Sequence, residues 1–287
     1  MAATVRLGTC SWADEGLLRT WYPKGVSNAA ARLRYYAERF DVVEVDSPFY
    51  ALPDPDVTRR WSERTPPHFT FHVKASAAMT FHEGEPTDRA FAEFRGALEP
   101  LELSGKLRGV LLQYHPRFVK SRAAKEELAR APERLAPLVP LIEFRHRSWM
   151  EPRERRDTLD FLERHGLAYV SVDAPMTQAS NVVPRVAAAT HAVSVIRFHG
   201  RNAKTWNIRG RSAADRFDWM YSAEELAEWV PKARELAEHA GEVYALFNNN
   251  RDDFAPRSAM IFRGLLDEAG TPATGGIEPP PAEMTLF

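Results

Sequence analysis

Seven stretches of the chain share one pattern, in which an apolar run ends in polar residues placed at alternate positions. Alternate residues of a β-strand point to the same face, so each polar pair shares a side. The pairs are Glu44 and Asp46 in VVEVDSPFY, His72 and Lys74 in FTFHVKA, Gln113 and His115 in GVLLQYHP, Glu143 and Arg145 in LIEFRHRSW, Ser171 and Asp173 in AYVSVDAP, and Arg197 and His199 in VSVIRFHGR, with Asn248 alone in VYALFNNN. Burial of so many ionisable groups is unfavourable unless the strand ends converge. In a parallel barrel they converge on one cavity, where barrel enzymes hold their catalytic residues.

Predicted strands alternate with amphipathic helices along the chain, which is typical of βα units. The segment 175–190 has a weak helical pattern and is predicted to be mostly irregular. Closed barrels commonly span about 250 residues as one domain. The sequence therefore predicts an α/β fold, a single (β/α)8 TIM-type barrel over residues 1–269. A disordered tail rich in Pro and Gly is expected over residues 270–287.

The overall charge is nearly balanced, with 38 Lys and Arg against 39 Asp and Glu in 287 residues. This balance argues against a chain that binds nucleic acid over its whole surface, but it leaves a local basic patch open. The single cysteine, Cys10, excludes an internal disulfide and a thiolate zinc cluster. The chain lacks a secretory signal at its start and a run of roughly 20 apolar residues that could span a membrane. We therefore expect a soluble cytoplasmic protein.

Several longer runs resemble the DUF72 (YecE-like) family. They are GTCSW, YYAERFDVVEVDSPFYALP, FHVKA, EFRHRSW, RFHGRN, RFDWMYSAEELAEW and ALFNNN, in this order between residues 7 and 265. The resemblance implies a TIM-type barrel but no particular reaction, because the family has no established activity. The positions that depart from the family pattern are Tyr114 and His115 after the fourth strand, and Asn250, Arg251, Arg257 and Ser258 after the eighth.

The cavity would bring acids, bases and cations together, which suits acid/base catalysis. The residues expected to be catalytic are Glu143, Asp173, His199 and Glu44. Glu143 and Asp173 are candidates for the acid and base, and His199 for a proton shuttle. Glu143 is expected to pair with Arg145. The alternative is that these residues form ion-pair networks that fill the barrel without catalysing a reaction.

The expected ligand is an anion that carries a ring. Its phosphate or carboxylate would bind the cations Lys74, Arg145 and Arg197. The aromatic side chains that could stack on a base or sugar are Trp12, Tyr50, Trp149 and Trp206, and those that could orient hydroxyls are Asn248 and Asn249. Ordinary packing is the alternative for the tryptophans, and an ordinary turn is the alternative for the asparagines.

A divalent metal is an open alternative that the residues do not favour. Glu44, Glu143, Asp173 and His199 come from different strands, as ligands in metal-dependent barrels do, but local signatures such as HxH are missing. The sequence also lacks a Gly-rich phosphate loop, so no motif indicates a nucleotide cofactor. Cys10 is either a nucleophile or a small buried residue.

The chain ends in EMTLF, which is similar to the short peptides that dock bacterial proteins on the replication sliding clamp. Leu286 and Phe287 would be the anchor, and an inert tail is the alternative. Two function classes follow. The first is a hydrolase-type enzyme acting on a phosphorylated, sugar-like or nucleic-acid-derived substrate. The second is a non-catalytic module that binds an anionic ligand or nucleic acid and is recruited to a partner such as the sliding clamp through its C-terminal tail. Catalysis requires a cavity carboxylate or histidine that is not saturated by ion pairs and is open to solvent.

Overall fold

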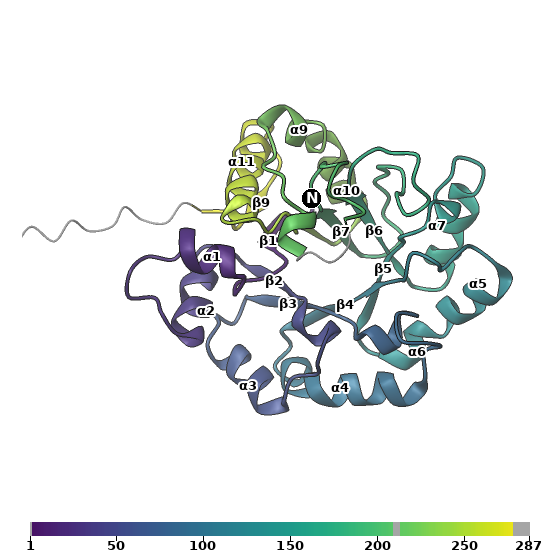
Figure 1. Cartoon of the computed structure of the whole chain (residues 1–287), viewed down its shortest axis with the longest axis horizontal. Coiled ribbons are helices and arrows are strands. Elements are labelled where there is room, and N and C mark those ends of the chain that lie inside the picture. The colour runs from purple at the N-terminus through teal and green to yellow at the C-terminus, as the bar shows by residue number, and fades with distance from the viewer. Residues whose placement is uncertain (1, 209–212, 278–287) are drawn as a thin grey trace, which may run out of the picture.

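The computed structural model describes residues 2–208 and 213–277, and eight parallel strands in this part of the chain close into a barrel (Figure 1). The strands are β1 (Val5–Thr9), β2 (Val42–Val45), β3 (Thr70–Lys74), β4 (Leu107–Gln113), β5 (Val139–Glu143), β6 (Ala168–Asp173), β7 (Val193–Phe198) and β8 (Glu242–Phe247). Each strand pairs with the next along the chain, and β8 pairs with β1. The predicted (β/α)8 TIM-type barrel is confirmed.

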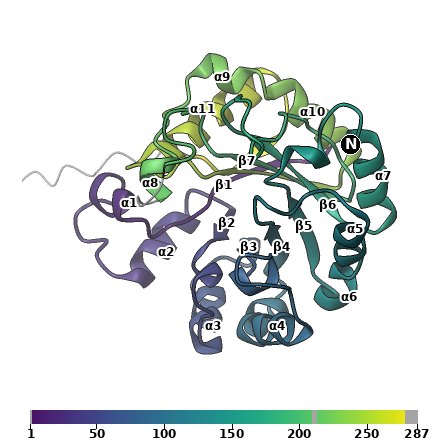
Figure 2. The same cartoon turned by 45° about the vertical axis from the view of Figure 1, so that its right-hand side comes forward.

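Helices surround the strands and cover their outer faces (Figures 1 and 2). They are α1 (Glu15–Thr20), α2 (Ala29–Ala37), α3 (Pro55–Glu63), α4 (Asp88–Leu103), α5 (Arg122–Ala129), α6 (Ala131–Leu135), α7 (Arg155–Arg164), α8 (Ala213–Arg216), α9 (Ala223–Ala227), α10 (Val230–His239) and α11 (Phe254–Glu268), with short 3-10 turns η1 (Ser47–Phe49), η2 (Ala77–Met79) and η3 (Arg147–Trp149). None of the described helices combines the length and hydropathy that a membrane span requires.

The sequence pattern predicts one helix near residues 123–135 and another over residues 223–239, but the structure has two helices in each segment. A proline lies in the first turn of the second helix in both cases, Pro132 in α6 and Pro231 in α10. Proline has no backbone N–H to donate to the preceding turn, so it starts a helix more readily than it continues one. The segment 175–190 contains no helix, as its pattern predicts.

The ordered part of the chain extends beyond residue 269, so the predicted boundary of the tail is wrong. Strand β9 (Ala273–Thr274) pairs with Val5 and Arg6, on the edge of β1 that β2 leaves unpaired. Gly275 follows with a φ of +77°, and a Cβ there would lie 2.5 Å from the Leu7 carbonyl oxygen. Glycine is therefore required at this close approach. Residues 278–287, with Leu286 and Phe287, lie outside the described residues, and the clamp contact stays a prediction.

The register of the strands decides which side chains point into the barrel. Residues that pair across parallel strands project to the same side of the sheet. Glu44 pairs with His72, Gln113 pairs with Glu143, and Val172 pairs with Arg197. These pairs place one ring of polar side chains inside the barrel. The ring of His72 packs on that of Tyr244, with 4.3 Å between ring centroids.

Candidate active site

Arg197 lies at the centre of a buried polar network at the carboxyl ends of the strands. Its guanidinium pairs with Glu44 from β2 and, at 2.5 Å, with Glu143 from β5. All three side chains are fully buried. One cation between two buried carboxylates cannot neutralise both, so one carboxylate needs further positive charge or a proton.

Glu143 receives the larger share of positive charge. Its Oε1 accepts a hydrogen bond from Gln113 at 2.7 Å and lies 3.0 Å from Nε2 of His199. Burial alone would raise the pKa of Glu143, but Arg197, His199 and Arg145 outweigh burial and hold that pKa well below its usual value. Arg145 Nη1 is 3.6 Å from Glu143, so the expected Glu143–Arg145 pair exists, but Arg197 is the closer partner.

His199 connects Glu143 to Asn248 through its two ring nitrogens. Burial lowers the pKa of His199 to about 4, although Glu143 opposes this shift. In the neutral ring, Nε2–H donates to Glu143 and Nδ1 accepts from the Asn248 amide at 2.9 Å. Both nitrogens are therefore engaged, and His199 fixes the orientation of Glu143.

Glu44 and Asp46 form a second carboxylate group that is not saturated. Burial raises the pKa of Glu44 to about 7; Arg197 opposes this shift and Asp46 adds to it. Glu44 Oε2 and Asp46 Oδ1 are buried atoms that accept no hydrogen bond, although Asp46 Oδ1 lies 3.9 Å from Nη2 of Arg197. A proton shared between the two side chains would satisfy both oxygens. Asp46 keeps 30% of its side chain exposed, so the pair opens to solvent.

Cys10 lies against the same network, and its surroundings disfavour a thiolate. Its Sγ is 3.6 Å from Nη2 of Arg197, and the residue is 3% exposed. Burial, followed by the nearby Glu44 carboxylate, raises the pKa of the Cys10 thiol well above its usual value. Cys10 is thus a small buried residue, the second of the two sequence interpretations.

Asp46 opens into a cavity of about 430 Å³ between the ends of β1 and β2 and the loop after β8. The lining residues are Cys10, Ser11, Trp12, Ala13, Asp14, Val45, Asp46, Ser47, Tyr50, Trp61 and Asn250. Trp12 meets Trp61 edge to face at 5.4 Å, and Tyr50 is 78% exposed. Of the aromatic residues expected to bind a ring, Trp12 and Tyr50 therefore line this cavity.

Asp14 is a further acidic residue of this cavity that the sequence analysis missed. Burial raises the pKa of Asp14 to about 6, while hydrogen bonds with Ser11 and Asn250 oppose the shift. Asp14 lies in the loop SWADEG, four residues after Cys10 at the end of the first strand, and this position could have indicated a site residue. Loops that follow barrel strands commonly contribute to the active site.

The cations Lys74 and Arg145 lie at the carboxyl ends of β3 and β5. Nζ of Lys74 lies 4.5 Å from the ring centroid of Phe49, and the guanidinium of Arg145 lies 4.7 Å from that of Trp206. Nε of Arg145 and Nε1 of Trp206 are buried donors without a hydrogen-bond partner. Buried donors without acceptors are costly, so this part of the barrel mouth is suited to an anion.

Asp173 does not face the cavity, contrary to the expectation from its strand. It pairs in register with Phe198 on the helix-facing side, opposite in direction to Arg197. Its carboxylate accepts hydrogen bonds from Tyr221 and Trp229, both at 2.7 Å, and from Arg201. The helix-facing side of β6 is as buried as the barrel side, which is why alternation alone assigned the wrong face.

Trp149 and Asn249 are also outside the cavity. Trp149 is fully buried, stacks on Phe144 at 4.4 Å and donates from Nε1 to the Phe118 carbonyl oxygen. Asn249 donates to the carbonyl oxygen of Trp219 and to Oγ of Ser258 in α11. Neighbouring residues at a strand end point to opposite sides, so Asn248 and Asn249 could not both face the cavity.

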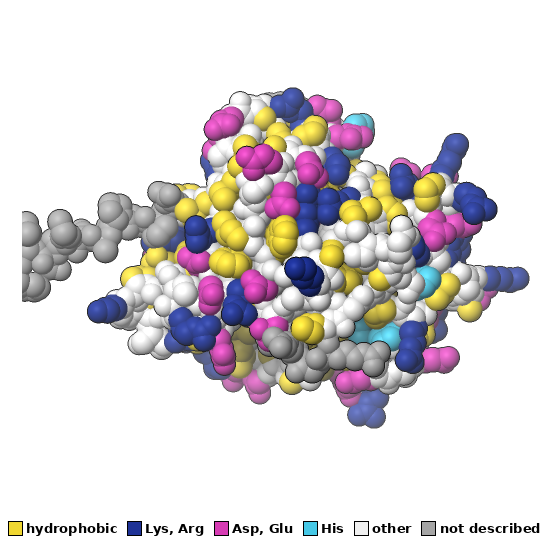
Figure 3. All heavy atoms as spheres, turned by 45° about the horizontal axis from the view of Figure 1, so that its top comes forward, with side chains coloured by type: hydrophobic (Ala, Val, Ile, Leu, Met, Phe, Trp, Pro, Cys, Tyr) yellow, Lys and Arg dark blue, Asp and Glu magenta, His cyan; other side chains and the backbone are white. Residues whose placement is uncertain are grey.

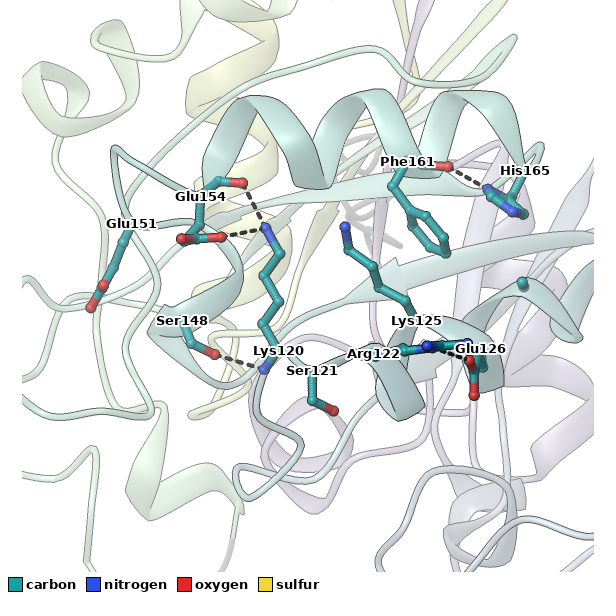
Figure 4. Close-up of a pocket in the computed structure, with 11 residues that line it drawn as sticks. Lys120, Ser121, Arg122, Lys125, Glu126, Ser148, Glu151, Glu154, Phe161 and His165 are labelled. Atoms are coloured by element: carbon teal, nitrogen blue, oxygen red, sulfur yellow. Dashed lines mark hydrogen bonds and ion pairs between the residues drawn. The ribbon is translucent and has the colours of Figure 1, made fainter.

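A larger groove of about 690 Å³ lies in the helical layer between α5 and α7 (Figure 4). Its buried cation, Lys120, is held by Glu154 at 2.8 Å and Asp157 at 2.6 Å, and Lys125 also contacts Asp157 at 2.6 Å. These ion pairs saturate both lysines. None of the barrel-interior residues lines the groove, so we do not assign the chemistry to it.

Within the described residues, no three His, Cys, Asp or Glu side chains converge in a way that could hold a metal ion. All four residues considered as metal ligands have other partners, and Asp173, held by Tyr221, Trp229 and Arg201, faces away from the other three. The carboxylates of Glu44 and Glu143 pair with Arg197, and His199 bonds to Glu143 and Asn248.

Comparisons with known proteins agree with the fold. The family model "Protein of unknown function DUF72" matches residues 6–284. The UPF0759 protein YunF of Bacillus subtilis is 31% identical over 271 residues, which cover 92% of this chain and 95% of YunF. A solved DUF72 family protein from Thermotoga maritima is 30% identical, with a TM-score of 0.80, covering 92% of this chain and 99% of that one. Another from Enterococcus faecalis is 25% identical, with a TM-score of 0.81, covering 92% and 96%. The chain therefore belongs to the DUF72 family.

Proposed function

We propose that the protein is an enzyme that uses acid/base catalysis, of the hydrolase type, on an anionic substrate that carries a ring. The observation that carries this proposal is the Glu44–Asp46 pair. It combines a raised carboxyl pKa, two oxygens without a donor and an opening into a cavity with aromatic walls. In a network that only stabilises the barrel, ion pairs and hydrogen bonds would occupy every carboxylate oxygen, as they do at Glu143.

Glu44 and Asp46 share the acid and base roles in this proposal. The proton held by the pair passes through Asp46, its exposed member, to the leaving group as the scissile bond breaks. The attacking water then forms the new bond and returns a proton to the pair, so the enzyme regains its starting state. Arg197 acts as a positioning residue, because it holds Oε1 of Glu44 while Oε2 carries no hydrogen bond.

Glu143 and His199 support this arrangement rather than react. Glu143 fixes the second side of the Arg197 guanidinium, and His199 with Asn248 fixes Glu143. We assign the substrate's anionic group to Lys74 and Arg145, with Trp206 beneath the guanidinium. The ring of the substrate would lie against Trp12 and Tyr50 in the cavity beside Asp46.

Hydrolysis assays on chromogenic nitrophenyl substrates test the proposal. The panel contains uronides, neutral glycosides, phosphomonoesters and phosphodiesters. We expect turnover of at least one member and a loss of about 100-fold or more in Asp46→Asn and in Glu44→Gln. The matched control is Asp267→Asn, a half-exposed carboxylate of α11, which should keep the parent rate.

Equal rates in the parent and Asp46→Asn would refute the catalytic assignment. A parent protein that binds panel members but converts none would favour the second function class, a non-catalytic binding module.

A further inference from the structure

Four aromatic rings form a continuous row along the barrel rim. The ring centroids of Tyr50 and Phe49 are 5.1 Å apart, those of Phe49 and His82 are 5.0 Å apart, and those of His82 and His115 are 4.9 Å apart. The rings come from η1 and from the loops that follow β3 and β4. Lys74 lies over Phe49 in the middle of the row. Of these four rings, only that of Tyr50 has a role in the proposed function.

The row connects two cavities. Tyr50 lines the cavity of about 430 Å³ that contains Asp46. His82 and His115 line a second cavity of about 680 Å³ between the loops after β3 and β4, together with Phe81 and Phe118. A ligand longer than one ring could therefore occupy both cavities and lie along the row between them.

The charges of the first cavity indicate which ligand fits. Its described lining residues include the carboxylates Asp14 and Asp46 but no Lys, Arg or His. A chain of phosphates would be repelled there. A ring with several hydroxyl groups would donate hydrogen bonds to the carboxylates and pack its apolar face on Trp12 or Tyr50.

The second cavity has no excess of positive charge in its described lining, because Arg117 and Arg130 line it together with Glu85 and Glu127. Burial lowers the pKa of His82 to about 4 and also lowers that of His115, so both rings are neutral near pH 7. Arg130 is paired with Asp88 and Glu127. On the face shown in Figure 3, basic and acidic side chains are interspersed, without a broad area of one sign. Single-stranded nucleic acid also stacks on aromatic rows, but its binding depends on a positively charged groove.

We propose that the substrate is an oligosaccharide that carries one acidic group. Successive sugar rings lie along Tyr50, Phe49, His82 and His115, and an acidic group reaches Lys74 and Arg145. This inference rests on the proposed function for the position of the reaction, and it adds the class and the length of the substrate.

Calorimetric titration of the full-length protein tests the inference, with β-1,4-linked glucose oligomers of one to six rings in which only one end ring is a glucuronate. We expect the dissociation constant to fall at least roughly 10-fold from monomer to tetramer. His82→Ala should remove most of this gain and leave monomer binding unchanged, whereas His82→Phe, which keeps a ring, should retain the gain. His68→Ala, at a side chain that is 62% exposed, is the matched control and should bind like the parent.

Three results would overturn the inference: affinity that does not depend on length, no binding of any of these oligomers at millimolar concentration, or tighter binding of hexathymidylate than of the hexamer. The proposed function can fail separately. Asp46→Asn should lose turnover but keep length-dependent binding. If turnover depends on Asp46 but the affinity does not change with the length of the oligomer, only the proposal of an oligosaccharide substrate is refuted.

Discussion

Replacing Glu44 with Gln tests the electrostatics of the carboxylate pair while nearly conserving volume. The folded protein holds a proton on Glu44 up to about pH 7, because burial raises its pKa from 4.5 to about 7. The unfolded chain releases that proton near pH 4.5. The folded state thus binds more protons between these values, and the free energy of unfolding must fall as the pH rises through this window.

The size of the effect follows from the two pKa values. Linkage over pH 5 to 8 gives a loss of about 2–3 kcal/mol for the parent, and this part of the pH dependence disappears when the side chain cannot titrate. Buried His72 and His199 act in the opposite direction, because their lowered pKa values cost stability as the pH falls. Only the difference between parent and variant isolates Glu44.

Urea denaturation at pH 5, 6, 7 and 8 measures this difference. The variant should gain about 2–3 kcal/mol relative to the parent from pH 5 to pH 8. Glu238→Gln, at an exposed position of α10, is the control and should run parallel to the parent. Parallel curves for Glu44→Gln and the parent would show that Glu44 is ionised throughout, and the shared proton would have to be abandoned.

Three further predictions follow from the contacts. Asp173→Ala should lower the free energy of unfolding by about 3–5 kcal/mol in urea melts, because it leaves the buried donors of Tyr221 and Trp229 without an acceptor, while the rate per folded molecule stays unchanged. Arg145→Ala should cost only about 1 kcal/mol, since Glu143 keeps Arg197, but should weaken acidic ligands roughly 10-fold in titrations, and Arg145→Lys should recover part of that affinity. A peptide of residues 279–287 should bind the bacterial sliding clamp with micromolar affinity by calorimetry, about 8 kcal/mol, and replacing Leu286 and Phe287 with Ala should abolish binding without changing the melting temperature of the whole protein. The first prediction is contradicted if Asp173→Ala is as stable as the parent. The second is contradicted if Arg145→Ala loses as much stability as a variant with an unpaired buried charge. The third is contradicted if the clamp titration gives no heat.

The barrel could be predicted because its signal repeats along the chain. Polar residues at alternate positions ended seven strands, and the parallel barrel is the fold in which those ends meet. The same alternation placed Glu44, Glu143 and Arg197 together correctly. It failed at Asp173, because strands of a parallel barrel are buried on both faces. Tyr221 and Trp229, which bind Asp173, lie about 50 residues further along the chain and give no local signal.

The acidic cavity was the part of the site that the sequence could not locate. The sequence pattern indicated Asp46, which follows the strand of Glu44. No sequence pattern indicates that Arg197 pairs with both Glu44 and Glu143. The low pKa of Glu143 and the raised pKa of Glu44 depend on this pairing. Trp149 was misassigned because a buried tryptophan near a strand end looks the same in sequence whether it packs or binds.

Carbon-13 NMR of the side-chain carboxyl groups, with labelled glutamate in the full-length protein, tests the raised pKa of Glu44 most directly. The signal that disappears in Glu44→Gln identifies Glu44. Its midpoint should lie near pH 7, as the raised pKa of Glu44 indicates. A Glu44 signal that titrates near pH 4 would contradict the proposed acid/base centre.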